Sequence, residues 1–148
     1  MATSFTNNWK NILDKLQSII RSEFKNALPT YRGFDNEPTG SQYLRLIPIG
    51  SDLLEYNVSS ETREFSINMM LHFKSANIKE AALDHILRLA SRLESLIVDN
   101  IAMTYTNEDS LTENLFNCRI ESTSFDSANP EEHIVSFDFK CQHLGNVG

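Results

Sequence analysis

A regular alternation of side chains over residues 63–74, REFSINMMLHFK, constrains the fold more than any other feature of the sequence. Every second residue from Phe65 to Phe73 is apolar, and most of the residues between them are polar or charged. This period of two is typical of a long β-strand with one buried face and one outward face. The buried face needs a packing layer from the same chain, and the outward face is available to water or to another protein.

Two amphipathic segments can supply that packing layer. In residues 8–28 the apolar side chains recur every three or four positions, and Pro29 ends the pattern. A second stripe of the same kind covers residues 77–100, with Asn77 as its candidate N-cap in a variant of the capping box. We expect both segments to be helices that cover the apolar face of residues 63–74.

Four further segments read as strands. Residues 42–49 and 53–58, separated by a turn at 50–52, come before the long strand, and residues 115–125 and 133–143 form a closing pair. The register that matches the apolar faces of the closing pair places Phe125 opposite Ile134, Ile120 opposite Phe139 and Cys118 opposite Cys141.

The sequence therefore predicts one domain over residues 1–148, a length that is ordinary for a single hydrophobic core. Its predicted order is helix, three strands, helix, two strands. The expected fold class is α+β, with an antiparallel sheet of about five strands and two helices packed on one face.

Charge and composition exclude several classes of function. The net charge is −7, and the 13 Lys and Arg residues are scattered, which argues against tight binding of nucleic acid. No apolar run is long enough to cross a membrane, and no export signal is recognisable, so we expect a chain made in the cytoplasm with reduced cysteines.

The sequence also lacks the usual signatures of catalysis. It contains no GxSxG, HExxH or GxGxxG motif and no phosphate-binding loop, and its five glycines leave few places where backbone amides could hold phosphate. We therefore expect no enzyme activity, no catalytic residues and no cofactor.

One group of residues could hold zinc. The register above brings Cys118 and Cys141 together, with His143 two residues further along the same face. The rest of this face is built from Phe and Ile, and neither a CxxC nor an HxxxH spacing is present. Two buried thiols packed as small apolar groups are the preferred interpretation, and no metal site is predicted.

The candidate interaction surfaces are the outward face of residues 63–74 and two polar loops, residues 29–41 and residues 106–114. Loops can adapt to a partner while the sandwich holds them in place. The aromatic residues of the first loop can also pack against the domain, and the acidic pair of the second can simply be solvated. His72, like His85 on the second helix, is assigned to surface or partner contacts. The candidate interface residues are Tyr31, Phe34, Glu64, Asn68, Met70, His72, Lys74, Glu108 and Asp109.

The chain resembles the tail terminator (tail completion) proteins of long-tailed bacteriophages of the lambda type. The stretches that carry this resemblance are WKNILDKLQSIIRSEF, REFSINMMLHFK leading directly into SANIKEAALDHILRLASRLESLI, and the closing HIVSFDFKCQH. The resemblance implies a structural virion protein of the tail, which forms a ring of six copies at the head-proximal end, ends tube polymerisation and provides the joint to the head. It also implies three partners: other copies of the chain, the tail tube protein, and a head-completion or connector protein. DNA would pass through the bore without tight binding, and no membrane would be involved.

Two alternatives stay open. The chain could be another head-to-tail joining or tube-like ring protein, which sequence separates poorly from a terminator. It could also be a small-ligand-binding or enzymatic α+β domain that encloses its ligand between helices and sheet, although the apolar face offers no evident polar cluster for such a ligand.

Overall fold

The computed structural model describes residues 6–33, 42–74, 80–129 and 132–146. These residues form two α-helices, one short 3-10 helix and six strands. The helices are α1 (Asn8–Phe24), η1 (Lys25–Ala27) and α2 (Glu80–Asp99). The strands are β1 (Thr30–Arg32), β2 (Gln42–Tyr56), β3 (Ser60–Lys74), β4 (Met103–Thr106), β5 (Thr112–Asn129) and β6 (Glu132–Asn146).

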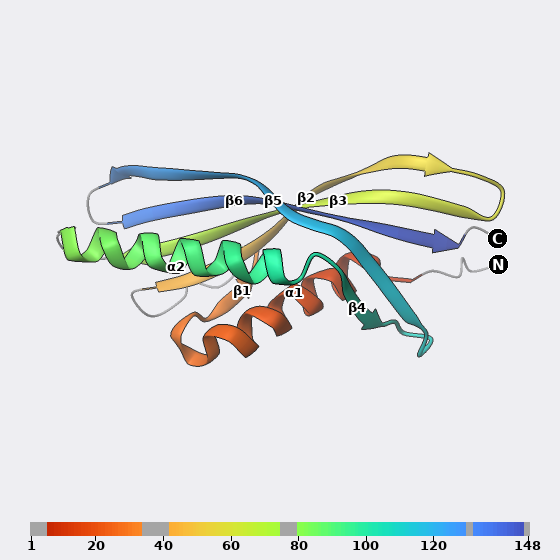
Figure 1. Ribbon diagram of the computed structural model, residues 1–148, viewed down its shortest axis with the longest axis horizontal. Helices are drawn as coiled ribbons and strands as arrows, with labels where there is room; N and C mark the ends of the chain where they lie inside the picture. Colours follow the sequence, from red (N-terminus) through yellow and green to blue (C-terminus); the bar gives the residue numbers. More distant parts are fainter. Residues whose placement is uncertain (1–5, 34–41, 75–79, 130–131, 147–148) are drawn as a thin grey trace.

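All six strands form one sheet in the order β1-β2-β3-β6-β5-β4, which curves into a half-barrel with the helices inside the curve (Figure 1). β1 runs parallel to β2, and every other neighbouring pair is antiparallel. The predicted fold class is therefore wrong: the sheet is mixed and has six strands. β1 and β4 have only three and four residues, too few to show an alternation in the sequence.

The sequence predicted two short strands where the structure has the single strand β2. This strand runs unbroken through the expected turn at residues 50–52. Two β-bulges, between Pro48 and Gly50 and between Leu53 and Glu55, absorb the irregularity. With β3 it forms one long hairpin, whose tip projects at the end of the molecule near the C-terminal end of β6 (Figure 1).

The alternation in β3 is confirmed by burial. Phe65, Ile67, Met69 and Leu71 are each at most 4% exposed. They lie in a single apolar core with the buried stripes of α1 and α2. Trp9 at the start of α1 meets the ring of Phe65 edge-on, with 4.8 Å between the ring centroids.

The β5–β6 register is partly as predicted. Ile120 does pair with Phe139, but Phe125 pairs with Val135 rather than with Ile134. Bulges in β5 cause this difference, since each adds a residue that the alternation alone cannot reveal. One bulge lies between Phe116 and Arg119. It leaves Cys118 without a paired residue on β6 and turns Phe116 to the outward face, opposite Gln142.

Helix ends follow local chemistry. α1 begins after Asn7, whose side chain accepts a hydrogen bond from the backbone N–H of Lys10. It ends at Phe24, four residues before the end predicted from Pro29, because Lys25 leaves the helical region with φ of 54° and ψ of −127°. Among the described residues, no helix combines the length and apolar character required for a membrane span.

Candidate functional site

Glu64 on β3 is part of an ion-pair network on the outward face of the sheet. Arg119 on β5 donates from Nη2 to Glu64 Oε2 at 2.9 Å, and Gln142 Nε2 donates to the same oxygen at 3.1 Å. The hydrogen bond from Arg119 holds the pKa of Glu64 below its ordinary value. Arg119 and Lys140 also pair with Glu121, at 2.6 and 3.2 Å. The charge of Glu64 is thus balanced within the chain.

Asn68 and Met70 lie further along the same face of β3. Both are half-buried, and they pair with Asp138 and Ser136 on β6. They form the middle of a polar surface that carries one adaptable thioether.

Three other predicted residues gather around Tyr43 on β2. His72 stacks on the Tyr43 ring with 4.6 Å between centroids and an interplanar angle of 11°. Tyr31 meets the same ring edge-on at 6.2 Å, and Lys74 Nζ lies 5.6 Å from its centroid. Arg45 lies over the same ring at 5.4 Å. Phe34 lies outside the described residues.

His72 is buried rather than being a surface residue as the sequence suggested. Only 6% of it is exposed, and its Nδ1 lies 2.9 Å from Glu132 Oε1. Its Nε2 is buried and has no hydrogen-bond partner among the residues that the structure describes. The alternation of β3 could not predict this burial, because Tyr43 comes from a neighbouring strand and covers the imidazole from the polar side.

His85 on α2 contacts the edge of the sheet. Its Nε2 lies 3.0 Å from Gln42 Oε1, and its ring packs against Phe73 with 5.7 Å between centroids. These contacts hold the N-terminal half of α2 against the start of β2.

The acidic turn between β4 and β5 is hydrogen-bonded to the start of α1. Glu108 Oε2 accepts a hydrogen bond of 3.0 Å from the backbone N–H of Asn7, and Oε1 accepts one from the side chain of Asn11. The Asn7 contact, followed by Asn11, keeps the pKa of Glu108 below its ordinary value. Asp109 is exposed, and Asn107 shapes the turn through its side-chain oxygen.

The two thiols contact each other in the core. Cys118 and Cys141 are both free and buried, and the hydrogen bond between them, together with burial, raises the pKa of Cys141 above its ordinary value. His143 is turned toward Glu113 on β5 and binds it through Nε2. Among the described residues, no group of three or more His, Cys, Asp or Glu side chains is arranged to hold a metal ion.

Sequence reasoning missed a polar cluster centred on Glu113. Besides His143, its carboxylate receives Asn107 Nδ2 at 3.2 Å and lies 3.1 Å from the hydroxyl of Tyr105. That hydroxyl is also 3.2 Å from Asn8 Oδ1, and burial raises the pKa of Tyr105. These bonds connect α1, β4, β5 and β6, so the cluster fixes the packing of the β4–β5 hairpin. The sequence gives no signal of this cluster, because its residues come from four elements that are far apart along the chain.

The tip of the β2–β3 hairpin was also missed as a surface. Every residue from Asp52 to Ser59 is exposed. The apolar run LLEYNV is visible in the sequence, but its pattern predicts an ordinary core strand. The exposed apolar side chains in this tip are Leu53 at 49%, Leu54 at 50%, Tyr56 at 62% and Val58 at 95%.

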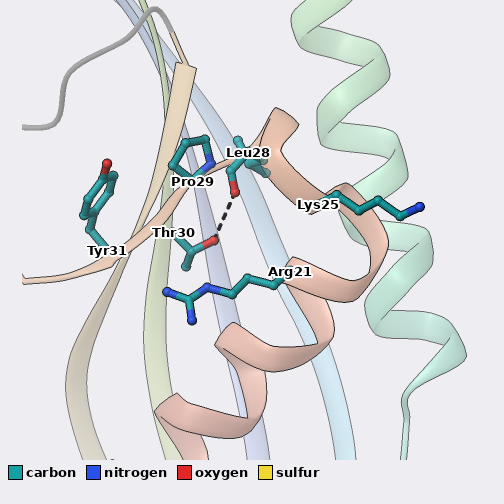
Figure 2. Close-up of a pocket in the computed structure, with 6 residues that line it drawn as sticks. All are labelled: Arg21, Lys25, Leu28, Pro29, Thr30 and Tyr31. Atoms are coloured by element: carbon teal, nitrogen blue, oxygen red, sulfur yellow. Dashed lines mark hydrogen bonds between the residues drawn. The ribbon is translucent and has the colours of Figure 1, made fainter.

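A cavity of about 550 Å³ lies between the C-terminal end of α1 and β1. Its lining residues are Arg21, Lys25, Leu28, Pro29, Thr30 and Tyr31 (Figure 2). The hydroxyl of Thr30 donates to the carbonyl of Leu28 at 3.3 Å, and the Arg21 side chain extends beside Thr30 (Figure 2). The cavity combines two cations with an apolar wall and contains no carboxylate among its described lining residues.

The fold is a half-barrel of mixed sheet with two helices inside its curve, and a run of exposed apolar side chains lies at the tip of the β2–β3 hairpin. The sequence matches no protein-family model and no curated protein. A search of solved structures found a similar chain in the virion of a native gene transfer agent particle. The two share 12% identity with a TM-score of 0.45, over 88% of this chain and 84% of that chain. At this level of likeness the comparison assigns neither a family nor a function.

Proposed function

We propose that the chain is a structural protein of a virion, and more specifically the subunit of a tail terminator ring. In this role it self-associates at the head-proximal end of a phage tail, ends polymerisation of the tube and provides the joint to the head. Its partners are other copies of itself, the tail tube protein and a head-completion or connector protein. The resemblance of residues 9–24, 63–97 and 133–143 to tail terminators supports this proposal.

The observation that carries the proposal is the exposed tip of the β2–β3 hairpin. It presents four large apolar side chains within six residues, Leu53 to Val58, at the end of a hairpin that projects beyond the helices (Figure 1). Exposed apolar side chains gathered at the end of one hairpin are a feature that interaction sites commonly show. A subunit that meets identical subunits through two different surfaces forms a ring when the rotation closes.

The charge of the chain suits a ring around DNA. With a net charge of −7 per copy, such a ring lowers the affinity of its bore for phosphate, so DNA can pass without being gripped. The outward face around Asn68 and Met70, together with Lys74 and Asp109, supplies surfaces for the tube and the head-joining protein.

The test is the state of assembly of the purified chain. We expect light scattering to give a mass that is a multiple of the 16.9 kDa subunit, and negative-stain microscopy to show single closed rings. Rings that stack into tubes would favour the tube-like alternative instead. A monomer at every concentration would contradict the proposal and favour a small-ligand-binding domain.

A further inference from the structure

We propose that the hairpin tip, residues 52–59, of one copy docks into the cationic cavity beside α1 of the next copy. This inference rests on the proposed function, because it supplies the contact between neighbouring subunits of the ring. It gives the cavity an occupant and gives the hairpin tip a binding site. The fold itself offers no other role for either feature. The cationic cavity is the one lined by Arg21, Lys25, Leu28, Pro29, Thr30 and Tyr31.

The hairpin tip is both apolar and acidic. Asp52 and Glu55 stand among its four exposed apolar residues, and no Lys or Arg occurs between residues 46 and 62. Within the described residues, neither acid has a cationic partner. A segment of this kind prefers a receptor that offers an apolar surface next to positive charge.

The cationic cavity offers that combination. Leu28 and Pro29 supply apolar surface, Tyr31 supplies an aromatic ring, and Arg21 and Lys25 supply positive charge (Figure 2). Its volume of about 550 Å³ is within the range of sites that enclose a ligand of several side-chain groups. Two or three side chains of the hairpin tip can be accommodated in such a space.

The charges of the cavity differ from those around it. Arg32 binds Asp14 and Gln17, and Arg92 binds Glu23 at 2.9 Å. In the part of the chain that the structure describes, Arg21 and Lys25 have no carboxylate partner. These two cations are therefore available to an acidic group from outside the subunit.

Lys25 also has an unusual backbone. Its φ of 54° lies in the left-handed region, where a non-glycine residue is strained. Lys25 follows the last residue of α1 and lines the cavity that lies between this helix end and β1 (Figure 2). A lysine at this position combines the turn with a positive charge, whereas the usual glycine would supply the turn alone.

The two surfaces lie at opposite ends of the molecule. In Figure 1 the tip of the β2–β3 hairpin is at the right-hand end, and the C-terminal end of α1 is at the left. The tip of one copy cannot reach its own cavity. Contact between these surfaces therefore joins different copies head to tail, which is the arrangement that a ring requires.

An exchange of charges between copies tests this contact. We expect Glu55→Arg and Arg21→Glu each to weaken assembly of the purified full chain at least about tenfold, because each places like charges together. Mixed in equal amounts, the two variants should assemble again. In an alternating ring, the basic tip of the first variant meets the acidic cavity of the second. The unaltered Glu55 of the second variant meets the unaltered Arg21 of the first, so every contact is attractive.

Asp99→Arg is the matched control, since Asp99 is exposed on α2 outside both surfaces. It should assemble like the wild type, and far-ultraviolet circular dichroism should show all variants folded. If the wild type assembles but both charge variants assemble equally well, or if the mixture fails to recover, another surface joins the copies and the inference is overturned. In that result the proposed function stands, whereas a wild type that never self-associates overturns both.

Discussion

Replacing Phe137 tests how the sheet faces the helices. Phe137 is completely buried on β6, where it pairs with Met69 of β3 and Thr123 of β5. Removing its ring forfeits about 1.5–3 kcal/mol of transfer free energy. The space left behind adds about 24 cal/mol for each Å³ that the surroundings fail to fill. Together these terms predict that Phe137→Ala lowers the free energy of unfolding by about 3–5 kcal/mol.

Phe125 provides a matched control on the neighbouring strand. It pairs with Val135, two residues from Phe137, yet it is 52% exposed. The ring of Phe125 stays largely in contact with water in the folded protein. Phe125→Ala should therefore lower the free energy of unfolding by less than about 1 kcal/mol. The contrast between the two rings separates loss of core packing from any general cost of losing an aromatic residue.

Urea unfolding measures both changes. Trp9, the single tryptophan, lies against Phe65 at the contact between α1 and the sheet, so its fluorescence reports separation of helix and sheet. All proteins must be compared at one concentration, because self-association stabilises the folded state by mass action. A loss below about 1 kcal/mol for Phe137→Ala would refute the assigned facing of β6.

Two further predictions concern ionisable groups. Because the bond from Arg119 lowers the folded-state pKa of Glu64, its stabilisation is present above the ordinary value of 4.5 and is lost as pH falls through the lowered value. Urea midpoints of the wild type should therefore fall more steeply in acid than those of Glu64→Gln, and parallel curves would contradict the pairing. The buried thiols, with the pKa of Cys141 raised, should resist a thiol-reactive dye at mildly alkaline pH until urea is added. Rapid labelling of the native protein would show that the core opens readily.

Long, regular elements were predictable from the sequence, and short or bulged ones were not. The alternation in β3 and the stripes of both helices extend over enough residues to identify each element and its buried face. β1 contains three residues, and its position at the sheet edge depends on parallel pairing with Leu44–Leu46, which no local pattern encodes. The bulge at Asn117, where φ is 52°, shifts the pairing of β5 with β6. It could not be predicted, because the added residue leaves the composition of the strand unchanged.

The candidate site was harder to predict than the fold. Asn68 and Met70 do lie on the outward face, since strand periodicity alone fixes their side of the sheet. His72 follows the same periodicity but is covered by Tyr43, and Glu64 is bound to Arg119. Such contacts join residues that are distant in the sequence, so they emerge only when the strand order is known.

The exposed hairpin tip follows from a mismatch of lengths. α1 has 17 residues and α2 has 20, so they extend about 26 and 30 Å at 1.5 Å per residue. β2 and β3 each have 15 residues, or about 50 Å at 3.3 Å per residue. The helices can therefore cover only part of the sheet's inner face, and the uncovered end of the hairpin carries Leu53 and Tyr56. Residues 52–59 at that end are all exposed.

Charge then limits which surface of another chain can meet the hairpin. Copies with a net charge of −7 repel one another on approach, so a stable contact must place opposite charges together locally. On the outward face of the sheet, Arg119 and Lys140 already bind Glu64 and Glu121, so these two cations are poor receptors for an acidic hairpin. The cavity beside α1 keeps its cations unpaired among the described residues and lies at the opposite end of the subunit. The length mismatch exposes the hairpin tip, and the charge balance favours the cavity beside α1 as its receptor in a head-to-tail contact.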